Sequence, residues 1–346
     1  MEKILVVQNI LPHYRIPFYN ALGKQYDITY LHSGDPAGDL CENFKEVVVK
    51  CSRIGPFYFQ KEVLKTFKKG NYKAVVLMFD LAWVNNLLLA LLYPKKVLFW
   101  GHGLGRNSIG NKVRNILVKK VHGIILYSER NLEDFVNAGV DPNHIFIANN
   151  TVLISNHGEN KEISKNNILF VGRTQKSKKV DELIEMFAEV IYKLPEETKL
   201  VIVGDGAEDA SLKKLAIRLK VTDRVVFKGE VLEDHKLREI FHSAFVYASP
   251  GPVGLGVLHS FAYGLPVLTF SEEHHGPEVA NIQNNVSGFL CKDREIYKSK
   301  LIKWASNSEL TEKMGANAYC VYKNDRNLEQ MVKEFSGAVR HLLINA

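Results

Sequence analysis

The stretch from Ser249 to Pro266 carries the residue types best suited to holding a phosphate group. It reads SPGPVGLGVLHSFAYGLP and follows an apolar segment, residues 245–248, that is typical of a buried strand. Its glycines are Gly251, Gly254, Gly256 and Gly264. Glycines let a backbone approach a ligand closely, and a helix N-terminus offers free N–H groups to an anion. The pattern predicts strand, glycine-rich turn, helix and strand, and it fits either a phosphate-bearing ligand or a close-packed turn that binds nothing.

A cluster of cations follows a second predicted strand, residues 167–172. Arg173 comes directly after this strand, and Lys176, Lys178 and Lys179 lie three to six positions further on. Cations at the carboxyl edge of a strand suit a diphosphate, because they neutralise it and donate hydrogen bonds to its oxygens. The alternative is a solvated basic loop. Placement directly after Val-Gly favours the diphosphate.

Several common catalytic motifs are missing from the sequence. It contains no DxD, no HExxH and no His/Asp/Glu cluster with metal-ligand spacing, so we expect neither a metal nor another cofactor. The protein's own cations would then have to neutralise any bound phosphates. The absence of GxSxG and GxxxxGK[ST] disfavours serine hydrolases and P-loop NTPases.

Composition describes an ordinary globular chain with a basic balance. The 346 residues are 46% hydrophobic and 24% charged, with a net charge of +7. Two domains fit this length. The charge favours nucleotide phosphates or anionic lipid over nucleic acid, because no nucleic-acid motif accompanies it.

Cysteine usage and the N-terminus indicate the compartment. The four cysteines, Cys41, Cys51, Cys291 and Cys320, form no CxxC pair, which favours reduced cytosolic thiols. The sequence begins MEKILVVQNI, a charged start without the features of a signal peptide. The most apolar segment, residues 74–93, contains Asp80 and predicts a buried strand and helix, not a membrane span. We therefore expect a cytoplasmic protein.

The elements that position these residues alternate along the chain. Short apolar runs alternate with helix-spaced segments from the N-terminus to about residue 148, and the alternation restarts at residue 167. Alternation of this kind predicts α/β domains with doubly wound parallel sheets. The polar segment 149–166 is the expected linker. We predict one Rossmann-like domain over 1–155, a second over 156–325, a central cleft between them, and a C-terminal helix over 326–346 that packs back on the first domain.

Residues 168–290 resemble the C-terminal domain of GT-B glycosyltransferases, most closely the large retaining family 4. The matching segments are FVGR-x4-K-x-VDELIEMF (170–187), VIVGDG (201–206), DRVVFKGEV (223–231), AYGLPV (262–267) and GPE followed by NNVSGFL (276–290). Their order and spacing span the second half of the chain, whereas the first half matches weakly. The resemblance implies metal-independent transfer of a sugar from a nucleoside-diphosphate sugar bound between two Rossmann-like domains.

The resemblance also implies roles for individual residues. Arg173 and Lys178 match the pair that holds the donor diphosphate and stabilises the leaving group. His102, in the segment FWGHG, matches the histidine that faces the donor sugar from the N-terminal domain. We expect these three residues to be catalytic. Further donor-binding residues are expected at Gly172, Gly206, Gly251, Gly254, Leu255, His259 and Glu278.

The chain departs from the family pattern in the glycine-rich stretch. Family members usually carry two glutamates eight positions apart, and these positions fall on Gly251 and His259. A histidine can still bond a ribose hydroxyl, whereas Gly251 can offer only backbone N–H groups. Glu278 is a candidate substitute carboxylate, or alternatively a first-turn acid favoured by a helix dipole.

In the first half, the expected acceptor-side residues are His13, Tyr14, Arg15 and Asp80. The first three follow the first predicted strand, and Asp80 follows the strand over 74–79. Structural alternatives are a loop that packs on the next helix for 13–15 and a helix N-cap for Asp80.

Two basic segments with apolar neighbours suggest contact with a membrane surface. One is 61–69, which follows the aromatic run IGPFYF, and the other is 111–121. On the second, Val113, Ile116, Leu117 and Val121 form the expected apolar stripe, with Lys112, Arg114, Lys119 and Lys120 elsewhere. Basic amphipathic helices can lie on anionic lipid, although ordinary surface helices share the pattern.

These observations together predict a glycosyltransferase on the cytoplasmic face of a bacterial membrane. We expect it to extend a lipid-linked saccharide in surface polysaccharide synthesis, with a nucleotide sugar as donor and peripheral membrane contact. Two alternatives remain open: a nucleoside-diphosphate-sugar epimerase of the same fold, and a catalytically silent partner subunit. The pair Arg173 and Lys178 argues against the silent subunit.

Overall fold

The structure is a computed structural model, and it describes residues 1–105, 107–154 and 164–345. The chain forms two compact units. Unit 1 consists of residues 1–153 and 327–346, and unit 2 consists of residues 154–326. Most of the expected linker 149–166, namely 155–163, lies outside the described residues.

Unit 1 is built on a parallel sheet of seven strands in the order β3-β2-β1-β6-β7-β8-β9. The strands are β1 (Lys3–Val7), β2 (Asp27–His32), β3 (Lys45–Val48), β6 (Ala74–Met78), β7 (Val97–Gly101), β8 (Gly123–Leu126) and β9 (Ile145–Ile147). The central strands are continuous apolar runs such as AVVLM and VLFWG. Such runs form strands here because helices cover both faces of a parallel sheet, so side chains on both faces of a central strand are buried.

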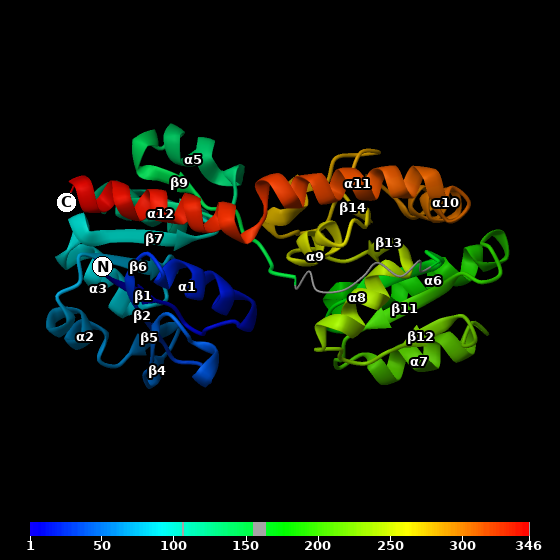
Figure 1. The fold of residues 1–346 in the computed structure, drawn as a ribbon, viewed down its shortest axis with the longest axis horizontal. Helices are drawn as coiled ribbons and strands as arrows, with labels where there is room; N and C mark the ends of the chain where they lie inside the picture. Colours follow the sequence, from blue (N-terminus) through cyan, green and yellow to red (C-terminus); the bar gives the residue numbers. More distant parts are fainter. Residues whose placement is uncertain (106, 155–163, 346) are drawn as a thin grey trace. The chain divides into compact units, whose positions relative to one another are not determined.

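Helices pack on both faces of this sheet and form two separate cores. They are α1 (Ile16–Gly23), α2 (Val63–Gly70), α3 (Val84–Leu92), α4 (Ser108–Lys120), α5 (Leu132–Asn137) and α12 (Leu328–Asn345). The C-terminal helix α12 packs beside α1 and against strands β6, β7 and β9 (Figure 1). Phe335 on α12 lies between Phe18 and Trp100, with ring centroids 5.2 and 4.9 Å away.

Two segments of unit 1 that the sequence singled out have a definite local structure. The aromatic run IGPFYF is part of an antiparallel hairpin, β4 (Cys51–Ile54) and β5 (Phe57–Gln60). Asp80 is not the N-cap of the following helix, because α3 begins at Val84 and its N-cap is Trp83. Instead, the Asp80 carboxylate accepts a hydrogen bond from Ala82 N and closes the turn after β6.

Unit 2 repeats the architecture with six parallel strands in the order β12-β11-β10-β13-β14-β15. The strands are β10 (Asn167–Val171), β11 (Lys199–Val203), β12 (Val225–Phe227), β13 (Ala244–Ser249), β14 (Val267–Phe270) and β15 (Gly288–Cys291). The helices are α6 (Val180–Val190), α7 (Asp209–Arg218), α8 (Asp234–His242), α9 (Gly256–Ala262), α10 (Arg294–Ala305) and α11 (Ser308–Asp325). This strand order is that of the dinucleotide-binding Rossmann fold.

Both units are therefore Rossmann-like α/β domains, which confirms the predicted fold class. In each sheet the strand order reverses at one point, between β1 and β6 in unit 1 and between β10 and β13 in unit 2. Ligands of such sheets bind beyond the carboxyl ends of the strands at this point. None of the described helices combines the length and apolar character needed to span a bilayer.

Candidate active site

The cationic segment and the glycine-rich turn of unit 2 meet at the point where its strand order reverses. Arg173 follows β10, and the turn follows β13, the neighbouring strand. The Lys178 ammonium donates to the carbonyl of Pro252 over 2.6 Å. In return, Gly251 N donates to the carbonyl of Lys178 over 3.2 Å. The two segments singled out in the sequence therefore form one structural element.

The lysines of this segment have different partners. Lys176 forms an ion pair with Asp181 at 2.6 Å, and Lys179 forms ion pairs with Glu182 and Glu273. Among the described residues, no carboxylate forms an ion pair with Lys178. Burial, and then the nearby charge of Arg173, lowers the pKa of Lys178. Two cations that repel one another and lack a carboxylate form a site that an anion would stabilise.

Gly251 has no room for a side chain. A Cβ atom at this position would lie 2.4 Å from the carbonyl oxygen of Ser177 and 2.6 Å from the carbonyl carbon of Lys178. Contacts this short with backbone atoms cannot be relieved by a side-chain rotation. A glutamate at this position is therefore incompatible with the observed packing, which places the lysine segment directly on the turn.

The other expected donor-binding residues lie around the same turn. Gly172 directly follows β10, Gly206 packs on the carbonyl of Thr174, and Leu255 precedes α9. A Cβ atom at Gly254 would lie 3.7 Å from a carboxylate oxygen of Glu278, which is only 5% exposed. Glu278 is the second residue of a short 3-10 helix, Pro277–Asn281.

His259 lies on α9, one turn after the glycines. Its ring packs edge-on against Phe241, with centroids 6.2 Å apart. Burial lowers the pKa of His259, and the charge of Asp234 acts in the opposite direction. The ring is therefore neutral near pH 7 and presents one N–H donor and one acceptor nitrogen.

Unit 1 contains a cavity of about 430 Å³ beyond the carboxyl ends of β1, β6 and β7. It lies where the strand order of this sheet reverses. Four residues predicted from the sequence line it, namely Tyr14, Arg15, Asp80 and His102. His13 is exposed and is not among the lining residues.

The cavity wall is rich in hydrogen-bond donors. The Arg15 guanidinium is 5% exposed and lies 4.6 Å from the Trp100 ring centroid and 5.1 Å from that of Tyr127. Among the described residues, no carboxylate forms an ion pair with it. The side-chain nitrogens Gln8 Nε2, Trp100 Nε1 and Arg114 Nε are buried without a hydrogen-bond partner in the described part of the chain. Arg15 and Arg114 both line the cavity, so its wall suits a ligand with oxygen acceptors.

His102 is exposed and directly follows the carboxyl end of β7. Its ring packs edge-on against the ring of Tyr127, with centroids 4.8 Å apart. The tight turn behind it requires Gly103, whose φ is +85°. A Cβ atom at Gly103 would also lie 3.0 Å from Phe135. This glycine lets the loop fold so that the histidine faces the cavity.

Comparisons with known proteins agree with this geometry. Residues 155–321 match the model of the family described as glycosyl transferases group 1. An uncharacterized glycosyltransferase of Haemophilus influenzae is 26% identical over 341 residues, covering 92% of each chain. The protein is a glycosyltransferase.

Solved structures of glycosyltransferases share the fold of the whole chain. Anabaena Alr3699/HepE, crystallised with UDP, superposes with a TM-score of 0.76 at 15% identity, covering 98% of this chain and 100% of its own. WaaG, described as a glycosyltransferase involved in lipopolysaccharide biosynthesis, superposes with a TM-score of 0.66 at 16% identity over 97% and 98% of the two chains. The glycosyltransferase therefore has the GT-B fold.

Sequence reasoning missed part of the unit 1 cavity of this glycosyltransferase. Gln8, Trp100, Arg114 and Tyr127 line it but were not predicted as site residues. Gln8 directly follows β1 and Trp100 lies within β7, so the apolar residues around them in the sequence indicate a buried strand and not a site. Arg114 was assigned to the cationic surface of a helix, because spacing alone does not show which side of α4 faces the cavity.

Proposed function

We propose that this glycosyltransferase transfers a sugar from a nucleoside diphosphate to a lipid-linked saccharide in the synthesis of a bacterial surface polysaccharide. The observation that carries the proposal is the pair Arg173 and Lys178, two cations beside one another without a carboxylate partner in the described structure. Retention of configuration follows from the family resemblance alone and is part of the proposal.

The reaction explains why the cations are left unpaired. As the bond between the sugar and the nucleotide breaks, negative charge develops on the departing phosphate. Fixed cations at that phosphate stabilise the transition state more than the ground state and so lower the barrier. A carboxylate partner would cancel this effect, which is why the ion-paired Lys176 and Lys179 are poor candidates for the role.

We assign the nucleoside and donor sugar to the glycine-rich turn. Backbone N–H groups of 251–256 would contact the phosphate or sugar, and His259 would bond the ribose. Glu278 would supply the carboxylate that the packing at Gly251 excludes. UDP is the nucleotide we expect first, because HepE was crystallised with it.

We assign the acceptor to the unit 1 cavity. Arg15 and Arg114 give it two cations, against one carboxylate from Asp80. Such a wall favours an acceptor that carries phosphate or carboxylate groups as well as hydroxyls. A saccharide linked through a phosphate to lipid meets both requirements. WaaG, which shares the fold, is described as a glycosyltransferase involved in lipopolysaccharide biosynthesis.

We also propose that unit 1 rests on the inner face of the membrane. On α4, the 73% exposed Ile109 and the 55% exposed Ile116 lie on one face with Lys112 and Lys119. The neighbouring α3 adds Leu91 and Leu92, which are 53% and 59% exposed. Apolar groups flanked by lysines suit an anionic bilayer surface. The apolar stripe expected from the sequence was partly wrong, because Leu117 is buried in the core and only Val113 and Ile116 of that stripe face outward.

A thermal-shift screen against UDP, GDP, ADP, dTDP and CMP, each alone and with its sugars, tests the donor proposal. We expect one nucleoside diphosphate to raise the unfolding temperature by several degrees, and transfer to an acceptor to continue in EDTA. Failure of every nucleotide to bind would overturn the proposal in favour of a silent subunit. Conversion of the donor sugar without any acceptor would instead identify an epimerase.

A further inference from the structure

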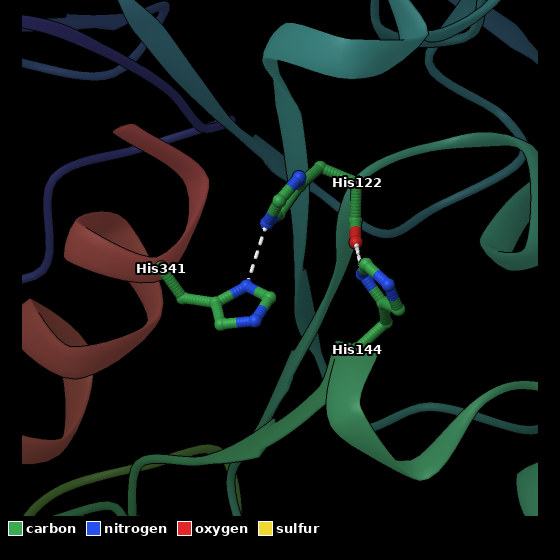
Figure 2. Close-up of side chains that lie close together, drawn as sticks. All are labelled: His122, His144 and His341. Atoms are coloured by element: carbon green, nitrogen blue, oxygen red, sulfur yellow. Dashed lines mark hydrogen bonds between the residues drawn. The ribbon is translucent and has the colours of Figure 1, made fainter. Parts of the chain in front are cut away.

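Three histidines from distant parts of the sequence converge in unit 1. His122 immediately precedes β8, His144 ends a short 3-10 helix immediately before β9, and His341 lies in the last turns of α12 (Figure 2). Each ring offers one nitrogen, and these three nitrogens all lie within 4.8 Å of one another. The cluster adjoins the amino ends of β8 and β9, so it lies at the sheet edge opposite the cavity.

We propose that His122, His144 and His341 bind one divalent transition-metal ion of the Zn²⁺ class, with water completing the coordination, and that this ion fastens α12 to the sheet. Imidazole nitrogen is a preferred ligand for zinc, copper, nickel and iron. Three histidines and a water form a familiar coordination set for Zn²⁺. Nothing in the proposed transfer reaction uses these residues.

The distances are compatible with this assignment. His122 Nε2 and His341 Nδ1 are 2.9 Å apart, in a direct hydrogen bond. Zn²⁺ binds imidazole at about 2.0–2.1 Å, so two ligand nitrogens in a tetrahedral site are about 3.3 Å apart. A bound ion would therefore need the His122–His341 contact to lengthen slightly and the third nitrogen to approach from within 4.8 Å.

The surrounding structure orients the rings. His144 Nδ1 lies in hydrogen-bond contact with the main-chain carbonyl of His122. A carbonyl can only accept, so Nδ1 carries the hydrogen and the neutral ring has its lone pair on Nε2. Metal-bound histidines commonly donate their second ring N–H to a backbone carbonyl in this way. The His341 ring packs against Phe146, with centroids 5.2 Å apart.

The three histidines differ in their access to solvent. His122 is 7% exposed, whereas His144 and His341 are half-buried, so an ion can enter from solvent. The backbone at Gly123 lies directly against the backbone at His144, since a Cβ atom at Gly123 would lie 2.4 Å from the carbonyl oxygen of His144. This close approach brings the rings of His122 and His144 near one another.

The proposal is tested by titrating untagged, metal-free protein with Zn²⁺, followed by calorimetry and thermal unfolding. We expect one site, with an unfolding temperature that rises with Zn²⁺. His341→Gln and His144→Gln should each weaken Zn²⁺ binding at least ~100-fold and abolish the thermal shift, since even outer-shell changes cost 10–100-fold. These half-buried residues are chosen over the buried His122 so that the variants fold.

His235→Gln is the matched control, because His235 lies on α8 in unit 2 and is not a member of the cluster. It should bind Zn²⁺ as the wild type does. Zinc held by the exposed Cys51 or Cys320 would persist in all variants and would be recognised in this way. If His341→Gln and the wild type bind Zn²⁺ equally, the three rings are only a hydrogen-bonded packing contact and the proposal is wrong. Sugar transfer should be unchanged in His341→Gln, which separates this site from the proposed reaction.

Discussion

Lys176, Lys178 and Lys179 are close in sequence, yet the structure gives them different environments. Lys176 and Lys179 are held by carboxylates, whereas Lys178 is held by the carbonyl of Pro252 and faces Arg173. A carbonyl orients an ammonium without neutralising it. No carboxylate among the described residues forms an ion pair with Lys178, which makes it the strongest single candidate for stabilising a leaving phosphate.

We predict that Lys178→Ala lowers kcat by about 10²–10³, the usual effect of removing one contact to developing charge. The measurement is initial-rate transfer with the donor identified by the thermal-shift screen. Lys176→Ala is the control, because its side chain is 76% exposed and paired with Asp181, and it should retain nearly full activity. Equal losses in the two variants, or none in Lys178→Ala, would remove the diphosphate assignment.

At the scale of single elements, α4 has two apolar sides. Leu117 and Val118 point into the core, whereas Ile109, Val113 and Ile116 are exposed at spacings of four and three residues. Residues at this spacing share one helix face. The apolar periodicity in the sequence mixes both sides, which explains why the predicted stripe combined buried and exposed residues.

We predict that the double substitution Ile109→Ser and Ile116→Ser weakens binding to vesicles that contain anionic phospholipid by roughly tenfold, because it removes apolar area that would enter the interface. Co-sedimentation with vesicles measures this. Ile217→Ser provides the control, since Ile217 is 64% exposed but lies on α7 of unit 2. Unchanged binding of the double variant would show that α4 does not contact lipid.

At the scale of the whole molecule, the chain ends by completing the core of the unit in which it began. Residues 327–346 belong to unit 1, although 173 residues of unit 2, 154–326, separate them from its first part. Met331, Phe335, Val339 and Leu342 of α12 are at most 1% exposed and pack with residues of β1, α1 and β7. Unit 1 therefore depends on a segment that lies far along the chain from its other residues.

We predict that Phe335→Ala lowers the free energy of unfolding of unit 1 by about 3–5 kcal/mol, the cost of a cavity left by a buried phenylalanine. Hydrogen exchange followed by mass spectrometry would read the two units separately, and unit 2 should keep its protection. Ile344→Ala, at an 81% exposed position of the same helix, should have little effect. Loss of protection in both units, or in neither, would contradict the idea that α12 stabilises unit 1 alone.

Some features of this protein follow from the sequence alone. The alternation of apolar runs and helical segments predicted two doubly wound domains, and the fold confirms it. The order of motifs from Phe170 to Leu290 predicted a glycosyltransferase, which the comparisons confirm. These features are readable because they depend on local periodicity and on spacing along one continuous segment.

Tertiary structure alone decided the contacts between distant residues. The bond from Lys178 to Pro252 spans 74 positions, and the histidines of the cluster are separated by 22 and 219 positions. Gly251 has no side chain because the backbone of Ser177 occupies the space that a Cβ atom would need. Arg114 turns toward the cavity because the buried Leu117 and Val118 set the rotation of α4 about its axis. No local pattern encodes such contacts, since they arise only when packing brings separate elements to the same sheet edge.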